Sequence, residues 1–348
     1  MNPMMYGASQ ISAAPSLEQL TLDLPGLLAY FPQTEASGTV ADNVEGAAAR
    51  DGAYGGSVSL QGAAFANGDL VAAYNASNDY MDFGTSDLAS VLDLNDMWFV
   101  LWALPDAAEV AATTLKTWLS LTGTGSTTIQ VNKTGAANMV ALDHRPDGNS
   151  VNRLYWADWY YSSRYMLLAV QISGTTGYLW RDGALVATKT GMTQASDAMN
   201  TAGANRIGAY FPTFQNAKGA WPHFAIGSGQ PLTTLLVNGL FEAVYPAVKD
   251  LFMTGDSHMT DNDYWIARLA GDLEVSGSEV WRERPYRIGY SGQRVLYWNT
   301  QLATDLPLIS GNPTKIGVNI CADDITGGTV EATIKTNLAG GIDKLRAK

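Results

Sequence analysis

The sequence is nearly free of cysteine and poor in histidine. Cys321 is the only cysteine among 348 residues, which excludes a disulfide framework and a cysteine-based zinc site. Three histidines are present, and His144 and His223 have no partners at the spacing of metal ligands. We therefore expect no cofactor, apart from the calcium ion considered below.

Positive charge and long apolar runs are also scarce. The chain has 21 Lys+Arg against 33 Asp+Glu, a formal net charge of -12, so phosphate backbones would repel it and we expect no nucleic-acid partner. The first basic residue is Arg50, so the N-terminus lacks the positive region of a secretory signal. The most apolar stretch, residues 97–115, is interrupted by Pro105 and two acidic residues and is unable to span a bilayer. We expect cytoplasmic synthesis and no membrane insertion. The protein could still function elsewhere, for instance on a particle released by lysis.

Glycine, aromatic residues and short apolar runs are abundant. Hydrophobic residues make up 46% of the chain and charged residues 16%, with 35 Gly, 10 Trp and 16 Tyr. Before residue 250, apolar runs are cut by Gly, Asn, Asp and Ser without helical periods between them, which favours an antiparallel β-sandwich. The clearest runs are residues 26–31, 97–104, 166–172 and 177–180. Asp182-Gly183, between two such runs, predicts a hairpin turn.

After residue 250 the pattern becomes strand, loop and helix, repeated. The strand-like runs are residues 251–254, 286–289 and 315–320, and helical spacing follows at 264–273, 294–302 and 330–345. Three such units predict a small parallel sheet. We therefore predict a multidomain chain with an N-terminal arm (1–20), a β-sandwich (21–246) and a small α/β segment (247–348).

Several phrases of the first half resemble the laminin-G-like, concanavalin-type jelly-roll family. They are Leu27-Leu-Ala-Tyr-Phe-Pro, then Asn78-Asp-Tyr-Met-Asp-Phe-Gly84 with Met97-Trp-Phe-Val-Leu-Trp102, then Leu168-Ala-Val-Gln-Ile with Gly177-Tyr-Leu-Trp-Arg-Asp-Gly-Ala-Leu-Val186. The resemblance covers about two-thirds of the chain. It implies a two-sheet jelly-roll sandwich that binds carbohydrate or protein on its concave face or rim loops, and it does not imply catalysis.

An aromatic cluster is the candidate carbohydrate site of this sandwich. Its members are Tyr155, Trp156, Asp158, Trp159 and Tyr160. Aromatic rings stack on the apolar C–H faces of sugars, and a carboxylate takes up their hydroxyls. The alternative is a strand whose alternate aromatic residues fill the core, while the others pack on a neighbouring subunit.

Two aspartates of the first half are candidate calcium ligands. Asp79 and Asp82 could supply oxygen ligands at a loop rim, as the resemblance implies for some members of the family. The alternative is that both are turn-forming residues, the commoner use of aspartate in loops.

The second half resembles the SGNH (GDSL-type) hydrolases in three ordered blocks. These are Leu251-Phe-Met-Thr-Gly-Asp-Ser-His258, Ile288-Gly-Tyr-Ser-Gly-Gln-Arg294 and Ile316-Gly-Val-Asn-Ile-Cys-Ala-Asp-Asp-Ile325. The resemblance implies Ser257 as nucleophile, with its own backbone N–H and that of Gly292 as oxyanion donors. A serine directly after a parallel strand also lies at the usual ligand crevice of such a sheet.

The chemistry of this family is only partly present. Asp323 stands where the family has an asparagine, and an ionised carboxylate cannot donate to an oxyanion; an alternative register would use Asn319. No histidine has an aspartate three residues before it, so the Asp-x-x-His block that supplies the general base is missing. The segment is also about half the family's size, so we expect an incomplete sheet completed by another chain or by self-assembly.

These observations lead to three hypotheses. The first is a non-enzymatic virion-surface structural or receptor-binding protein, such as a bacteriophage tail-fibre, baseplate or head-spike component. It would bind host bacterial surface polysaccharide and assemble with itself or with other virion proteins, by analogy with phage adhesins that join such modules. The second is a carbohydrate O-acyl esterase that uses Ser257 and is completed by a second chain. The third is a purely structural virion protein.

Overall fold

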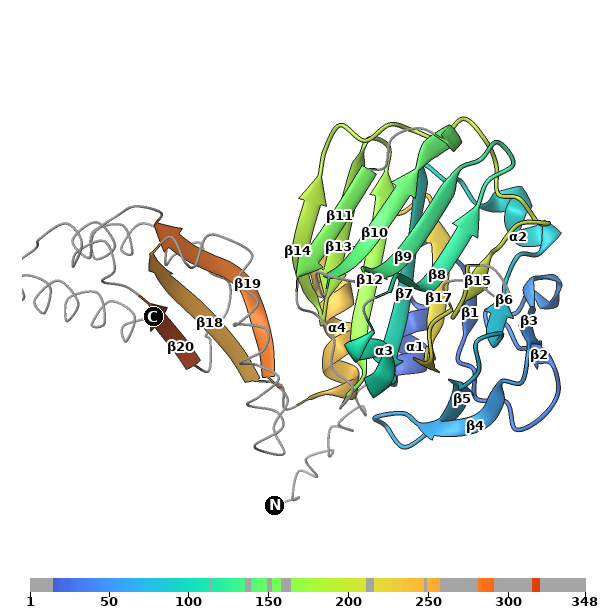
Figure 1. Ribbon diagram of the computed structural model, residues 1–348, viewed down its shortest axis with the longest axis horizontal. Helices are drawn as coiled ribbons and strands as arrows, with labels where there is room; N and C mark the ends of the chain where they lie inside the picture. Colours follow the sequence, from blue (N-terminus) through green and yellow to red (C-terminus); the bar gives the residue numbers. More distant parts are fainter. Residues whose placement is uncertain are drawn as a thin grey trace, which may run out of the picture.

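The computed structural model (Figure 1) describes most of the first 246 residues and three strands beyond them. The described residues are 15–112, 114–134, 139–148, 152–157, 164–210, 216–246, 249–256, 281–290 and 315–319. The first part contains two antiparallel sheets, and the last three segments form a separate small sheet. The predicted fold class, an antiparallel β-sandwich followed by a small parallel sheet, is confirmed.

Sheet one is built around a long central strand, β7. In spatial order its strands are β14 (Ala184–Lys189), β13 (Thr176–Arg181), β12 (Met166–Ser173), β7 (Asp96–Pro105), β16 (Gly219–Ala220), β5 (Leu70–Tyr74) and β4 (Ser59–Ala64). Strand β17 (Phe224–Ser228) also pairs with β7 and joins β1 (Leu27–Phe31) to the sheet. The predicted strands at 26–31, 97–104, 166–172 and 177–180 therefore all belong to this sheet.

Sheet two packs face to face on sheet one. Its strands in order are β11 (Asn152–Ala157), β10 (Met139–Arg145), β9 (Thr128–Thr134), β8 (Lys116–Thr122), β15 (Arg206–Ile207), β6 (Tyr80–Asp82), β3 (Gly52–Gly55) and β2 (Val40–Ala41). The main core lies between the sheets and includes Phe99, Leu101, Leu168, Val131 and Leu142.

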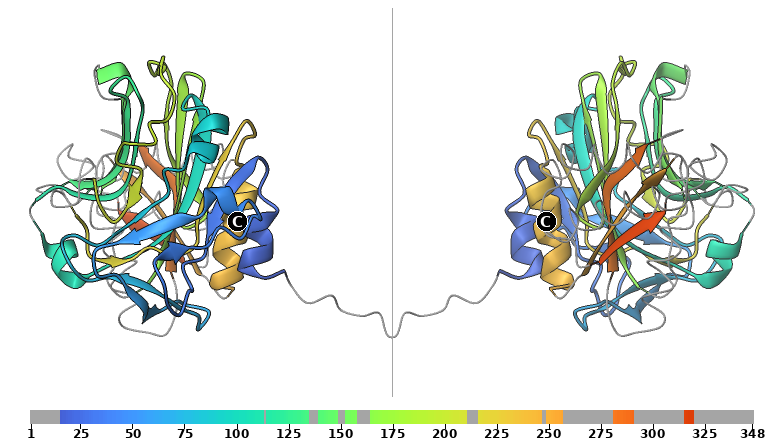
Figure 2. Two further views of the ribbon diagram at one scale, coloured as in Figure 1. Left: turned by 90° about the vertical axis from the view of Figure 1, so that its right-hand side faces the viewer. Right: turned by 90° about the vertical axis from the view of Figure 1, so that its left-hand side faces the viewer.

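Two of the four described helices, α1 (Leu17–Leu22) and α4 (Thr234–Val244), cover the outer face of sheet one. The other two are α2 (Ser86–Val91) and α3 (Ala107–Ala111), with 3-10 turns η1 (Ala48–Arg50) and η2 (Pro146–Gly148). In Figure 2, α1 and α4 lie side by side against sheet one. They close a second core, in which Trp98 and Trp102 of β7 meet Phe241 of α4.

Strand β7 is thus buried on both faces, which explains its apolar run. Phe99 and Leu101 face sheet two, and Trp98, Val100 and Trp102 face the helices. A strand covered on both sides has no polar face, so its sequence shows no alternation. None of the described helices is long and apolar enough to cross a membrane.

One turn of the sandwich was predicted from the sequence, and one helix near its start was not. Asp182 (φ 47°) and Gly183 (φ 86°) form the hairpin turn between β13 and β14, as the Asp-Gly pair predicts. Helix α1 begins at Leu17, inside the segment expected to be an arm, and Leu17 is buried in the second core. Residues 17–20 therefore pack with the sandwich in this structure.

The small sheet consists of three parallel strands. Its order is β19 (Trp281–Tyr290), β18 (Lys249–Asp256) and β20 (Lys315–Asn319), with β18 in the middle. Both pairings are parallel, and Gly255 pairs with Gly289 on one side and with Asn319 on the other. The three strand predictions of the second half are confirmed, while the three predicted helices lie outside the described residues.

Candidate functional site

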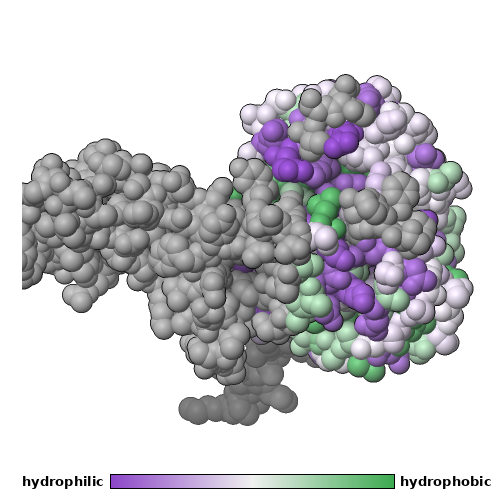
Figure 3. All heavy atoms as spheres, viewed as in Figure 1, coloured by the Kyte–Doolittle hydropathy of each residue, from purple (hydrophilic) through white to green (hydrophobic). Residues whose placement is uncertain are grey.

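The outer face of sheet two is polar, in contrast to the helix-covered outer face of sheet one. Along β9, Ile129 and Val131 point into the core, and the alternate residues Thr128, Gln130 and Asn132 point outward. Strand β10 repeats the pattern with outward Asp143 and Arg145. Figure 3 shows this face, where hydrophilic residues gather over the second sheet. Polar side chains from neighbouring strands are therefore brought next to one another.

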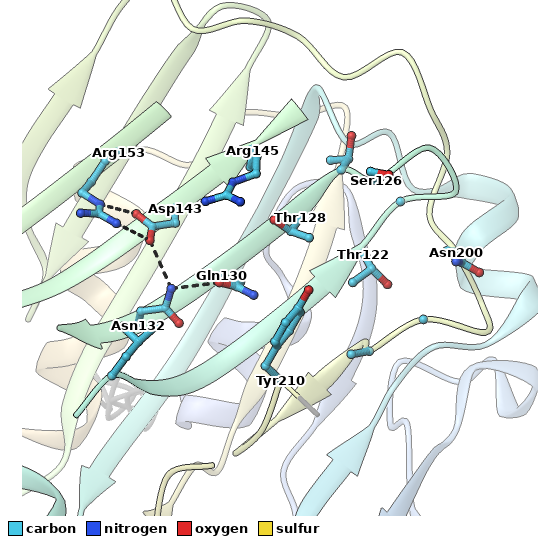
Figure 4. Close-up of a pocket in the computed structure, with 15 residues that line it drawn as sticks. Thr122, Ser126, Thr128, Gln130, Asn132, Asp143, Arg145, Arg153, Asn200 and Tyr210 are labelled. Atoms are coloured by element: carbon cyan, nitrogen blue, oxygen red, sulfur yellow. Dashed lines mark hydrogen bonds and ion pairs between the residues drawn. The ribbon is translucent and has the colours of Figure 1, made fainter. Parts of the chain in front are cut away.

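Four polar side chains of this face form a connected array (Figure 4). The polar array consists of Gln130, Asn132, Asp143 and Arg153. Arg153 donates from Nε to Oδ1 of Asp143 (2.6 Å) and from Nη2 to Oδ2 (2.8 Å). The Asn132 amide donates to Oδ2 of Asp143 (3.3 Å) and to Oε1 of Gln130 (3.1 Å). The strand ladder sets this geometry, because Asp143 and Arg153 are directly paired between β10 and β11.

The array is held in place from beneath. Asn132 is 1% exposed, and its Oδ1 accepts a hydrogen bond from the Thr117 hydroxyl (2.9 Å). With its oxygen occupied, the amide can only direct its two N–H donors toward Asp143 and Gln130. The hydrogen bonds to Asp143 raise the pKa of Arg153, so its guanidinium stays charged. These planar groups thus have defined orientations.

The array forms part of the wall of an open hollow of about 630 Å³. On the side of β8 and the loop after it, the hollow is bounded by Thr122, Gly123 and Ser126. Asn200 and Gly203 lie on the same side, where the Asn200 backbone N–H donates to the carbonyl oxygen of Thr122 (2.8 Å), and Tyr210 also lines the hollow (Figure 4). Its volume lies within the range of about 300–1,000 Å³ that is typical of small-molecule sites.

Two carboxylates stabilise the loops beyond one end of the hollow without lining it. Asp147 accepts a hydrogen bond from the backbone N–H of Ser196 (3.1 Å), which lowers the pKa of Asp147. Asp197 accepts one from the backbone N–H of Gly125 (2.5 Å). Nearby His144 is fully buried, and burial lowers its pKa, so this ring is neutral at pH 7. These contacts fix the rim of the hollow.

The predicted aromatic cluster falls only partly within the described residues. Tyr155 and Trp156 belong to β11, whereas Asp158, Trp159 and Tyr160 lie outside the described part of the chain. Position 155 pairs with Ala141 and shares its strand face with Arg153, the outer face. Position 156 pairs with Val140, which is buried in the main core. The strand therefore divides these two positions between opposite faces of sheet two.

The carboxylates of both candidate calcium ligands, Asp79 and Asp82, bind other groups of the protein in this structure. Asp79 is fully buried, and its carboxylate accepts from the backbone N–H groups of Ser57 (2.7 Å), Asn75 (2.8 Å) and Ala76 (2.8 Å). Asp82 forms an ion pair with Arg206 (3.3 Å). Among the described residues, no three His, Cys, Asp or Glu side chains come together in a group that could hold a metal ion.

The candidate catalytic residues Ser257, Gly292 and Asp323 lie outside the described residues. The strands that precede them are described, and all three residues follow carboxyl ends of parallel strands. Ser257 comes directly after β18, Gly292 two residues after β19, and Asp323 four residues after β20. The alternative donor Asn319 is the last residue of β20, where it pairs with Gly255. The carboxyl ends of the three strands, with Asn319 among them, therefore lie at one edge of the sheet.

The polar array itself was not singled out from the sequence. The alternation Thr128-Ile-Gln-Val-Asn132 marks a half-buried strand and its polar face. The partners Asp143 and Arg153 are ten residues apart, and only the β10–β11 register brings them together. The alternation could have suggested the face, whereas the array needed the strand pairing.

No protein-family model and no curated protein matches the chain. Among solved structures, it is similar to the botulinum neurotoxin serotype D binding domain, with a TM-score of 0.47 and 11% identity over 62% of this chain and 51% of that chain. A serotype D ligand binding domain in complex with N-acetylneuraminic acid gives a TM-score of 0.49 and 10% identity over 62% and 50%. The chain thus spans about half the length of these two toxin structures. Domain 4 of a GH43 extracellular arabinanase from Geobacillus stearothermophilus, in complex with arabinotriose, gives 0.44 and 16% over 62% and 98%.

Proposed function

We propose that the β-sandwich binds carbohydrate in the hollow on the outer face of sheet two. The observation that carries the proposal is the array of Gln130, Asn132, Asp143 and Arg153, whose planar groups are oriented by one another. Neighbouring hydroxyls of a sugar ring each donate and accept, and oriented amides and carboxylate–guanidinium pairs match them two at a time. Groups oriented before binding lose less entropy when the ligand arrives.

The apolar side of a sugar also needs a surface. Tyr210 is half-buried at the edge of the hollow, and Tyr155 is the residue of the predicted cluster that shares the strand face of the array. We propose these two rings as stacking partners for C–H faces of the sugar. Asp158, Trp159 and Tyr160 follow β11 and remain candidates for extending the site.

The test is calorimetric titration of the purified full chain with oligosaccharides prepared from a panel of bacterial surface polysaccharides. Saturable binding of at least one class, with a negative heat-capacity change, is the expected result. A panel in which no oligosaccharide binds would contradict the proposal.

The finer proposal is a role on the surface of a virion. A carbohydrate-binding sandwich joined to a parallel-sheet segment is the arrangement that resembles phage adhesins. In this role the chain is made in the cytoplasm, assembles with itself or with other virion proteins, and binds host surface polysaccharide. Co-sedimentation of the chain with infectious particles supports this role, and its absence from purified particles would contradict it.

A second candidate function is ester hydrolysis by the α/β segment. The observation that favours it is the strand order β19-β18-β20: the chain passes from β18 to β19 on one side, and the connection from β19 then crosses to β20 on the other side of β18. In open parallel sheets ligands bind at such a switch point, outside the carboxyl end of the strand. Ser257 directly follows the carboxyl end of β18 in the sequence, and we propose it as the nucleophile.

The esterase proposal is tested with the assembled particle or complex and an acetylated polysaccharide. Release of acetate that falls by about a thousandfold in Ser257→Ala is expected, because the attacking oxygen is removed while the sheet is retained. Thermal melting of the variant controls for folding. Turnover that is equal in the wild-type protein and in Ser257→Ala would end this proposal.

A further inference from the structure

Arg145 stands apart from the polar array of the hollow. It is the last residue of β10, two residues after Asp143 on the same strand face, and its side chain is exposed. Figure 4 shows hydrogen bonds linking Gln130, Asn132, Asp143 and Arg153, and none of them reaches Arg145. The two arginines of the hollow therefore differ: Arg153 is engaged by a carboxylate, whereas the guanidinium of Arg145 has no partner within the described part of the chain.

The charges that line the hollow do not cancel. Among the described residues, the lining groups that carry charge at pH 7 are Asp143, Arg145 and Arg153. The bidentate pair of Asp143 and Arg153 is neutral as a unit, which leaves the positive charge of Arg145. The whole chain carries -12, so this is a local reversal of sign in an acidic protein. Asp147 and Asp197 lie beyond the rim and accept backbone N–H groups there.

A free guanidinium in a binding hollow has a preferred ligand. Its planar N–H groups match the two oxygens of a carboxylate, in a bidentate contact that is about twice as strong as a neutral hydrogen bond. The adjacent array offers both donors and acceptors and therefore fits sugar hydroxyls better than a second anion. A hydroxyl-rich molecule with one carboxylate satisfies both halves of the hollow.

We propose that the hollow selects an acidic saccharide, a uronic or nonulosonic acid residue, whose carboxylate binds Arg145. This inference rests on the proposed carbohydrate function and adds the ligand class to it. The sugar hydroxyls bind Gln130, Asp143 and Arg153 of the array, and the carboxylate lies against β10 at Arg145. Removing the charge of the sugar, or that of Arg145, then removes the same contact.

The experiment uses a panel of acidic bacterial oligosaccharides, each paired with its carboxyl-reduced, neutral counterpart. Binding to the full-length wild-type chain, Arg145→Gln and Arg145→Lys is measured under identical conditions. The wild-type protein is expected to prefer acidic members by about tenfold or more. Arg145→Gln is expected to bind both forms equally. Arg145→Lys is expected to retain part of the preference, because an ammonium keeps the charge but lacks the paired N–H donors of a bidentate contact.

The outcomes separate this inference from the proposed function. Wild-type binding that is equal for acidic and reduced forms, or a preference that survives in Arg145→Gln, overturns the acidic-ligand inference and leaves carbohydrate binding intact. No binding of either form to the wild-type protein overturns both. Melting temperatures of the variants close to that of the wild-type protein identify a lost preference as a binding effect, and Arg145→Lys provides a second variant with the charge retained.

Discussion

Replacing Asp143 by asparagine should uncouple ligand binding from stability. Asp143 accepts two hydrogen bonds from Arg153 and one from Asn132. An asparagine keeps the shape but has one acceptor oxygen and an NH₂ group, which faces a donor of Arg153 in either orientation and in one of them faces that of Asn132 as well. The array then has to separate at one of these contacts.

The structure predicts a small effect of Asp143→Asn on stability and a larger one on ligand affinity. The Arg153 side chain is 45% exposed, so solvent screens the ion pair and its loss should cost at most about 1 kcal/mol of unfolding free energy. In the bound state the same change removes an oriented, charge-assisted acceptor. Such a hydrogen bond is worth about 1.5–3 kcal/mol, or about a 10- to 150-fold increase in Kd.

The assay combines thermal melting with titration of a binding oligosaccharide. Asp87→Asn is the matched control, since it breaks the ion pair between Asp87 and Arg50 (2.5 Å) and neither residue lines the hollow. Both variants should melt within a few degrees of the wild-type protein, and only Asp143→Asn should bind weakly. Equal affinities of Asp143→Asn and the wild-type protein would refute the assignment of the array as the binding surface.

Two further predictions concern stability. Burial lowers the pKa of His223 from 6.5 to about 4, so the folded protein holds the ring neutral. The neutral ring contributes fully to stability above pH 6.5, and this contribution is lost as the pH falls from 6.5 to 4. The total loss in unfolding free energy is about 3 kcal/mol. Chemical denaturation from pH 7 to pH 4 should therefore show a smaller loss for His223→Asn, which tolerates the φ of 53° at this position, and parallel profiles would contradict this. Gly227→Ala places a Cβ 2.2 Å from the Trp98 ring and should cost about 1–3 kcal/mol, whereas Gly239→Ala in α4, where the new Cβ meets nothing within 4 Å, should stabilise by about 0.5–1 kcal/mol. Thermal melts with the same sign for both glycine variants would count against the packing described here.

Strongly buried elements were the easiest to predict. The run Met97–Leu104 could be recognised as a strand because β7 is covered on both faces and carries no polar alternation. Asp182-Gly183 predicted its hairpin because both residues adopt positive φ. The parallel strands β18, β19 and β20 were predicted from their spacing. Very short strands such as β15 and β16 have no such pattern, since their pairing depends on neighbours distant in the sequence.

The candidate site was harder to predict because its chemistry is divided among strands. The sequence drew attention to aromatic residues 155–160, where several rings stand together. The structure gathers polar groups instead, from β9, β10 and β11, and their contacts depend on register. Tyr155 is the one residue at which the two descriptions meet, because its position shares a face with Arg153.

The most direct test of the central claim is a crystal structure of the chain with a bound oligosaccharide from the titration panel. The account predicts sugar density in the hollow of about 630 Å³, with hydroxyls within hydrogen-bonding distance of Gln130 and Asp143. A saccharide bound elsewhere on the molecule, with the hollow filled only by solvent, would contradict it.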